Sequence, residues 1–165
     1  MDQSSCDLII SSFDALRSGN NEKIQEANSL LSELISRPIF NELCTIATTN
    51  GDAYVRFLAV ISIKRSLTIR KDNISQEEAE LIKQFIINYI FREGIERNRE
   101  FVITLGCSLA SKANNGDTSN LLPLFFDLHD QLIQSAVQMI ERDGSVALFF
   151  ITELIDLDIF TPEEF

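Results

Sequence analysis

Residues 21–36, NEKIQEANSLLSELIS, carry a helical pattern in which apolar residues return every three or four positions. The stripe consists of Ile24, Ala27, Leu31 and Leu34. The opposite side of this segment is polar, as expected for an amphipathic helix on a protein surface. Pro38 follows closely, and because proline disfavours helical geometry in the residue before it, the helix is expected to end by Arg37.

The same pattern continues on both sides of this helix and predicts eight helices in four pairs. We place the pairs at about residues 5–36, 38–70, 75–111 and 119–158. The second helices begin near residues 22, 53, 96 and 145, a spacing of roughly 40 residues that is typical of HEAT-type repeats. We therefore expect an all-α fold, a right-handed α-α superhelix of the HEAT/ARM type with about four antiparallel helix pairs.

Capping residues support several of the predicted boundaries. Asp52 can cap a helix over about 53–70, and Ser75 with Glu78 forms a capping box. Pro38 is placed to open a helix over 38–49. The segment from Leu121 to about Arg142 is helical throughout, with room for a kink. Near the end of the sequence, Thr161, Pro162 and Glu164 predict the start of a ninth helix, so we expect residues 1–165 to be part of a longer array.

Composition and charge exclude several classes of protein. Apolar residues make up 45% and charged residues 24%, and the net charge is −11. This negative charge disfavours direct nucleic-acid binding, where positive groups must displace counterions, and favours basic protein partners. No apolar run reaches the roughly 18 residues needed to span a membrane. The amino terminus lacks the pattern of a secretory signal, which predicts an intracellular protein.

The sequence offers little catalytic chemistry. His129 is the only histidine, so a two-histidine metal site cannot be built. Cys6, Cys44 and Cys107 lie far apart, and we expect Cys44 and Cys107 to be reduced core residues. Phosphate-binding glycine loops are absent, and the acid pairs sit in predicted first turns, where they stabilise helix starts. We predict that the chain is not an enzyme and binds no cofactor or metal.

A further comparison concerns the order of motifs between residues 26 and 67. Glu26-Ala27 begins an "eA…L…L" helix, a short helix follows a proline, and Val55-Arg56 begins a "vR…A…lK" helix. The remaining matched positions are Leu30, Leu31, Leu34, Pro38, Phe40, Ala59, Ile63, Lys64 and Leu67. This arrangement resembles the amino-terminal HEAT-repeat domain of the karyopherin-β (importin-β) family.

The resemblance implies a nuclear transport receptor. In this family the first repeats bind the small GTPase Ran in its GTP form through second helices that line a concave surface. The implied partners also include a cargo protein with a basic signal and nucleoporins, and the implied locations are cytoplasm and nucleus. The residues implied to face Ran are Gln25, Asn28, Ser29, Ser32, Arg56, Lys64, Arg65, Arg99 and Ser108.

Two alternatives accompany this interpretation. Each implied residue could have a structural role instead; Arg56, for example, could pair with Asp52 one helical turn earlier. The chain as a whole could be a HEAT-repeat scaffold of a protein complex unrelated to transport. An unrelated helical bundle would require the later helices to fold back on the earlier ones.

Overall fold

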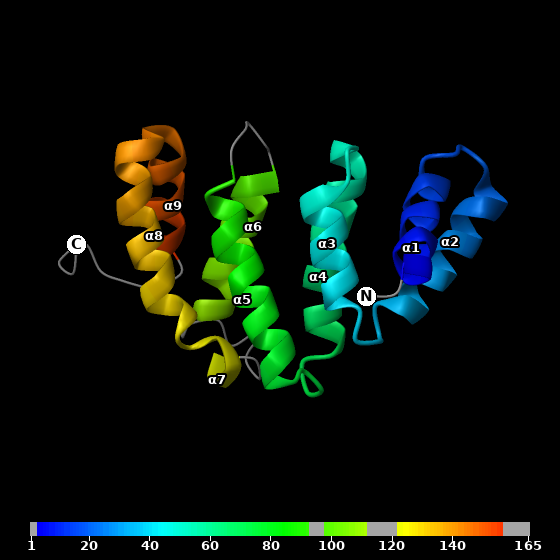
Figure 1. Ribbon diagram of the computed structural model, residues 1–165, viewed down its shortest axis with the longest axis horizontal. Helices are drawn as coiled ribbons and strands as arrows, with labels where there is room; N and C mark the ends of the chain where they lie inside the picture. Colours follow the sequence, from blue (N-terminus) through cyan, green and yellow to red (C-terminus); the bar gives the residue numbers. More distant parts are fainter. Residues whose placement is uncertain (1–2, 93–97, 112–121, 157–165) are drawn as a thin grey trace. The chain divides into compact units, whose positions relative to one another are not determined.

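The computed structural model describes residues 3–92, 98–111 and 122–156, and every regular element in these ranges is a helix. The chain divides into two compact units, Met1–Arg70 and Lys71–Phe165. Among the described residues, no helix is both long and apolar enough to cross a membrane. The helices of each unit are labelled in Figure 1.

The first unit holds four helices that pack as two pairs. They are α1 (Gln3–Leu16), α2 (Asn21–Leu34), α3 (Phe40–Thr49) and α4 (Ala53–Ile69). The most extensive packing is between α1 and α2 and between α3 and α4, and α1 also contacts both α3 and α4. Short turns join the members of each pair, which therefore run antiparallel (Figure 1).

The core of this unit consists of the stripes that the sequence predicts. On α2, Ala27, Leu31 and Leu34 are buried, while Ile24 is half-buried. On α4, the predicted seam is buried except for the half-buried Leu58. Phe13 and Phe40 are about 1% exposed and are among the largest fully buried side chains of the unit.

Two of the predicted helix starts are confirmed in atomic detail. The Asp52 carboxylate accepts a hydrogen bond from the Tyr54 backbone N–H at 2.8 Å. In the capping box, the Ser75 hydroxyl accepts from the Glu78 N–H, and the Glu78 carboxylate accepts from the Ser75 N–H. Each cap satisfies backbone donors that have no partner within the helix.

The predicted start of the third helix at Pro38 is wrong. The Ile39 N–H donates to the carbonyl of Arg37 at 2.9 Å, which places Pro38 in a tight turn. Ile39 is the N-cap, and α3 begins at Phe40. Proline fixes its own φ at a value that suits such a turn as well as a first helical turn, so the residue alone could not separate the two.

The second unit contains four long helices and one short one. They are α5 (Gln76–Ile90), α6 (Asn98–Ala110), α7 (Leu122–Phe125), α8 (Leu128–Arg142) and α9 (Gly144–Asp156). Helix α6 contacts α5, α8 and α9, and α7 lies against α5 and α6. The segment predicted as one helix from Leu121 to Arg142 is interrupted at Phe126-Asp127. The helix start predicted at Thr161 lies outside the described residues.

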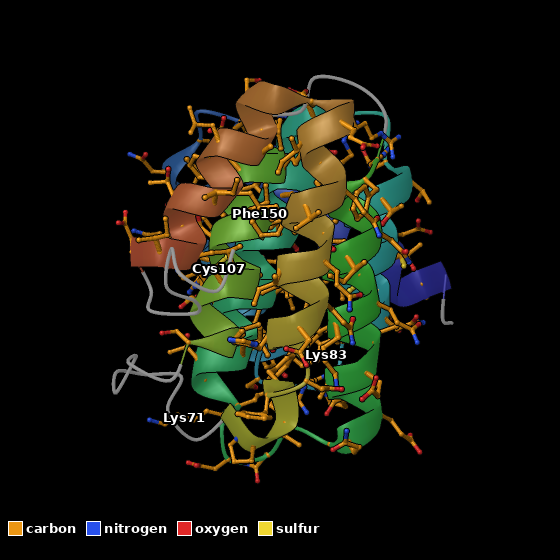
Figure 2. The ribbon with its side chains drawn as sticks, turned by 90° about the vertical axis from the view of Figure 1, so that its left-hand side faces the viewer. Lys71, Lys83, Cys107 and Phe150 are labelled. Carbon is orange, nitrogen blue, oxygen red and sulfur yellow. The ribbon has the colours of Figure 1, made fainter. Side chains whose placement is uncertain are left out.

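Helices α6 and α8 approach each other closely at Gly106. A Cβ atom added there would lie 2.9 Å from Ile86 Cγ2 and 3.3 Å from Leu132 Cδ2. Cys107 and Phe150 are both 0% exposed, and Figure 2 shows them in the interior behind α8 and α9. Glycine at position 106 therefore permits dense packing among three helices.

The all-α class and the pairwise packing expected of a HEAT/ARM-type solenoid are confirmed. Each unit contributes two packed pairs of long helices, α1–α2 and α3–α4 in the first, and α5–α6 and α8–α9 in the second. The handedness of the superhelix and the proposed repeat boundaries stay predictions.

We predict that Gly106→Ala lowers the stability of the second unit. Replacing glycine by alanine inside a helix normally stabilises it by about 1 kcal/mol. Overpacking of a dense core costs about 1–3 kcal/mol, so a net loss of about 1 kcal/mol is expected. Urea unfolding of both proteins measures the difference. Gly144→Ala is the control, since nothing lies within 4 Å of a Cβ there and no loss is expected. Unchanged or higher stability of Gly106→Ala would contradict the prediction.

Candidate binding surface

The four predicted residues of α2 share one exposed face. Gln25, Asn28, Ser29 and Ser32 are all exposed. At about 100° per residue, they occupy the arc opposite the buried Ala27. The structure therefore brings this set together on a polar helix face.

The three predicted residues of α4 do not form a single group. Lys64 and Arg65 are exposed, whereas Arg56 is half-buried. Arg56 and Arg65 are nine residues apart, which places them on opposite sides of the helix. The Arg56 Nη1 group donates to the Asn50 carbonyl at 2.7 Å, so this residue fastens the α3–α4 turn.

The outward face of α4 also carries aromatic residues that the sequence analysis did not select. Tyr54 and Phe57 are each 37% exposed, and Ile61 is half-buried between them and the basic pair Lys64 and Arg65. No acidic residue occurs in α4, although the chain as a whole is strongly acidic. Apolar residues on both sides of this helix were the available signal for a second contact surface.

Arg17 supports this face from the end of α1. Its Nη2 atom lies 2.6 Å from Asp52 and 2.7 Å from Asp14, and its guanidinium carbon lies 5.1 Å from the centre of the Tyr54 ring. Hydrogen bonding to Arg17, followed by the Tyr54 backbone N–H, lowers the pKa of Asp52. Asp52, which the sequence offered as a partner of Arg56, thus joins α1 to the start of α4.

We predict that Asp52→Asn destabilises the first unit at pH 7 because the amide keeps a capping oxygen but loses the charge facing Arg17. A depressed folded pKa stabilises the fold above the unfolded pKa, near 3.9, and this contribution disappears as pH falls through the folded pKa. The difference in melting temperature between wild type and variant should therefore shrink between about pH 5 and pH 2.

The control for this pH series is Asp156→Asn, which removes an exposed carboxylate on α9. Its melting temperature should show no comparable convergence with wild type. A constant gap for Asp52→Asn across the acidic range would show that its charge does not contribute.

The two predicted residues of α6 lie on different sides of that helix. Arg99 and Ser108 are both half-buried and are nine residues apart, about 180° around the axis. The Arg99 Nη2 group donates to the Arg92 carbonyl. Ser108 shares its side of the helix with the exposed Thr104. The structure thus separates Arg99 from the Ser108 face.

Lys83 is a buried cation that the sequence analysis also missed. Its side chain is 3% exposed, and Nζ lies 2.5 Å from Glu80 and 2.8 Å from Asp127. Burial opposes the charged form most strongly, but hydrogen bonds from Asp127 and Glu80 overcome it and raise the pKa. Figure 2 shows Lys83 behind the lower part of α8. It ties α5 to the α7–α8 turn.

We predict that Lys83→Met changes unfolding free energy by less than about 1 kcal/mol, because methionine fills the space and the half-exposed carboxylates can be hydrated. Removing both carboxylates, in Glu80→Ala/Asp127→Ala, leaves the buried ammonium without an anion and should cost about 2–3 kcal/mol. Chemical denaturation of the three proteins gives the order. A larger loss for Lys83→Met than for the double variant would contradict it.

The described residues show no cluster of metal-ligating side chains. Cys6, Cys44 and Cys107 are buried free thiols, as predicted for the latter two. Burial raises the pKa of Cys44 to about 12, and it raises that of Cys107 as well, so both thiols are poor nucleophiles. His129 is partly exposed, and its Nδ1 lies 3.0 Å from Asp130.

Paired amphipathic helices that present polar and aromatic faces define the class of this molecule: it is a helical-repeat binding protein. Residues 23–92, from the first turn of α2 to just past α5, match the model of the importin-beta N-terminal domain family. The chain therefore carries an importin-β amino-terminal domain, and its resemblance to the karyopherin-β family is confirmed. This is a family of transport receptors, not of enzymes. The comparison with curated proteins found no match.

Proposed function

We propose that this chain belongs to a nuclear transport receptor that binds the GTP form of Ran through the outward faces of α2, α4 and α6. The observation that carries the proposal is the importin-β domain match, which spans α2 to α5. The exposed set on α2 and the basic pair Lys64 and Arg65 on α4 supply accessible side chains at the implied positions.

The α4 face is the strongest part of this proposed surface. Protein interfaces are enriched in aromatic residues and arginine at their centres, and such residues carry much of the binding energy. Tyr54, Phe57 and Arg65 are residues of this kind on a single helix face. Arg56 and Arg99 fit better as structural residues, since both hold backbone carbonyls near helix ends.

The proposed cycle involves a cargo protein with a basic signal, whose charge would complement the net charge of −11. Binding of Ran in the GTP form would lower cargo affinity, and linkage then requires cargo to lower Ran affinity by the same factor. Nucleoporins are further proposed partners, and the receptor would work in both cytoplasm and nucleus.

Titration of the purified chain with Ran, loaded with either GTP or GDP, tests the proposal. We expect at least tenfold tighter binding of the GTP form, and at least a further tenfold loss in Lys64→Glu/Arg65→Glu. The matched control is Lys23→Glu, which reverses an exposed lysine of α2 outside the candidate face and should bind as wild type does.

Equal affinity for the two nucleotide forms, or equal weakening by the control and the double variant, would contradict the proposal. The alternative, a HEAT-repeat scaffold of a non-transport complex, would then be favoured. Circular dichroism of each variant separates a lost surface from a lost fold.

A further inference from the structure

Helices α8 and α9 leave large apolar side chains in contact with solvent. Val137 and Ile140 of α8 are each 49% exposed, and Leu148 and Ile155 of α9 are 68% and 38% exposed. Neither α5 nor α6 carries a large apolar residue with comparable exposure. This concentration on a single helix pair is unlike the scattered exposed apolar residues of ordinary surfaces.

These residues form two parallel stripes. On α8, Val137 and Ile140 continue the half-buried Ile133, at i, i+4 and i+7. On α9, Leu148 and Ile155 flank the half-buried Ile151, at i, i+3 and i+7. We call these six residues the α8–α9 face.

The two stripes lie on the same side of the pair. Relative to the buried residues of its helix, each stripe is rotated in the same sense along the chain, by about 80° to 180°. The helices are packed neighbours joined by a tight turn at Asp143, and they stand side by side toward the viewer in Figure 2. Antiparallel direction and equal sense of rotation then turn both stripes away from α6.

The surroundings of this face are acidic. Between residues 127 and 156 there are six acidic residues and one basic residue, Arg142. The guanidinium of Arg142 lies over the Phe91 ring, with 5.8 Å to the ring centre. Asp130, Glu141 and Asp156 are exposed on the two helices. Apolar stripes flanked by carboxylates would attract a ligand that is apolar on one side and positively charged beside it.

We propose that the α8–α9 face docks a cationic amphipathic helix of a partner protein. A third helix can lay an i, i+3, i+4, i+7 stripe between the stripes of two antiparallel helices, as in known helix-in-groove recognition. Lysine or arginine on its flanks would then meet Asp130, Glu141 and Asp156. A second copy of this chain is a poor occupant because two copies of charge −11 repel each other. The site does not depend on Ran binding, which is proposed for other helices.

The test uses the whole chain and a synthetic 18-residue peptide with leucines on one helical face and lysines on the other. Fluorescence anisotropy should show binding that weakens at least threefold between 50 and 300 mM salt. Val137→Glu/Leu148→Glu should weaken it at least tenfold. The matched control is Leu8→Glu, which alters the 42% exposed leucine of α1 and should leave binding unchanged.

A second peptide, with every lysine replaced by glutamate, separates charge recognition from simple apolar contact and should not bind measurably. Equal binding of the two peptides, or equal loss in the control and the double variant, overturns the proposal. So does concentration-dependent dimerisation that Leu148→Glu abolishes, because the occupant is then a second copy. Failure of Ran to bind leaves each of these outcomes unchanged.

Discussion

An amphipathic helix of 13 to 17 residues cannot bury its apolar stripe alone, and this constraint governs the structure. In the first unit, Val55, Ala59 and Ile63 of α4 are at most 1% exposed because α4 is covered by both α3 and α1. In the second unit, α6 is enclosed by α5, α8 and α9. Each fully buried large apolar side chain contributes about 1.5–3 kcal/mol, so the contacts between pairs are as necessary as those within them.

Hydrophobic burial is non-directional, and a few polar contacts determine where the helices stop and which turn meets which. The Ser66 hydroxyl donates to the Ile35 carbonyl at 2.7 Å, which satisfies a backbone acceptor at the end of α2 from the middle of the unit. Arg17 joins the end of α1 to the start of α4, and Lys83 joins α5 to the α7–α8 turn. All three contacts act at helix ends, where the chain must change direction.

Local signals predicted much of this fold because they act within one helical turn. The stripe of α2 and the capping box of Ser75 and Glu78 depend only on neighbours in sequence. The partners of Arg17 and Lys83 could not be predicted, since Asp52 and Asp127 are 35 and 44 residues away. At Pro38, a turn and a helix start share the same φ, and only the path of the chain selects between them.

The same distinction explains the candidate surface. Exposure of the α2 set follows from the polar arc of an amphipathic helix, which the sequence displays directly. Arg56 and Arg99 were selected for their charge, yet both reach backbone carbonyls at helix ends that only the folded chain brings within range. Tyr54 and Phe57 were passed over because an apolar residue in a helix is normally assigned to the core.

Charge is segregated between the two exposed faces, and this separates their partners. Exposed charges interact over about 8 Å at physiological salt, so each partner senses the charges beside its own contact rather than the net charge alone. Lys64 and Arg65 on α4 favour a ligand with acidic groups beside its apolar contacts, whereas Asp130 and Glu141 on α8 favour a basic one. Opposite local charge beside apolar side chains allows one acidic chain to hold two partners that would not compete for the same face.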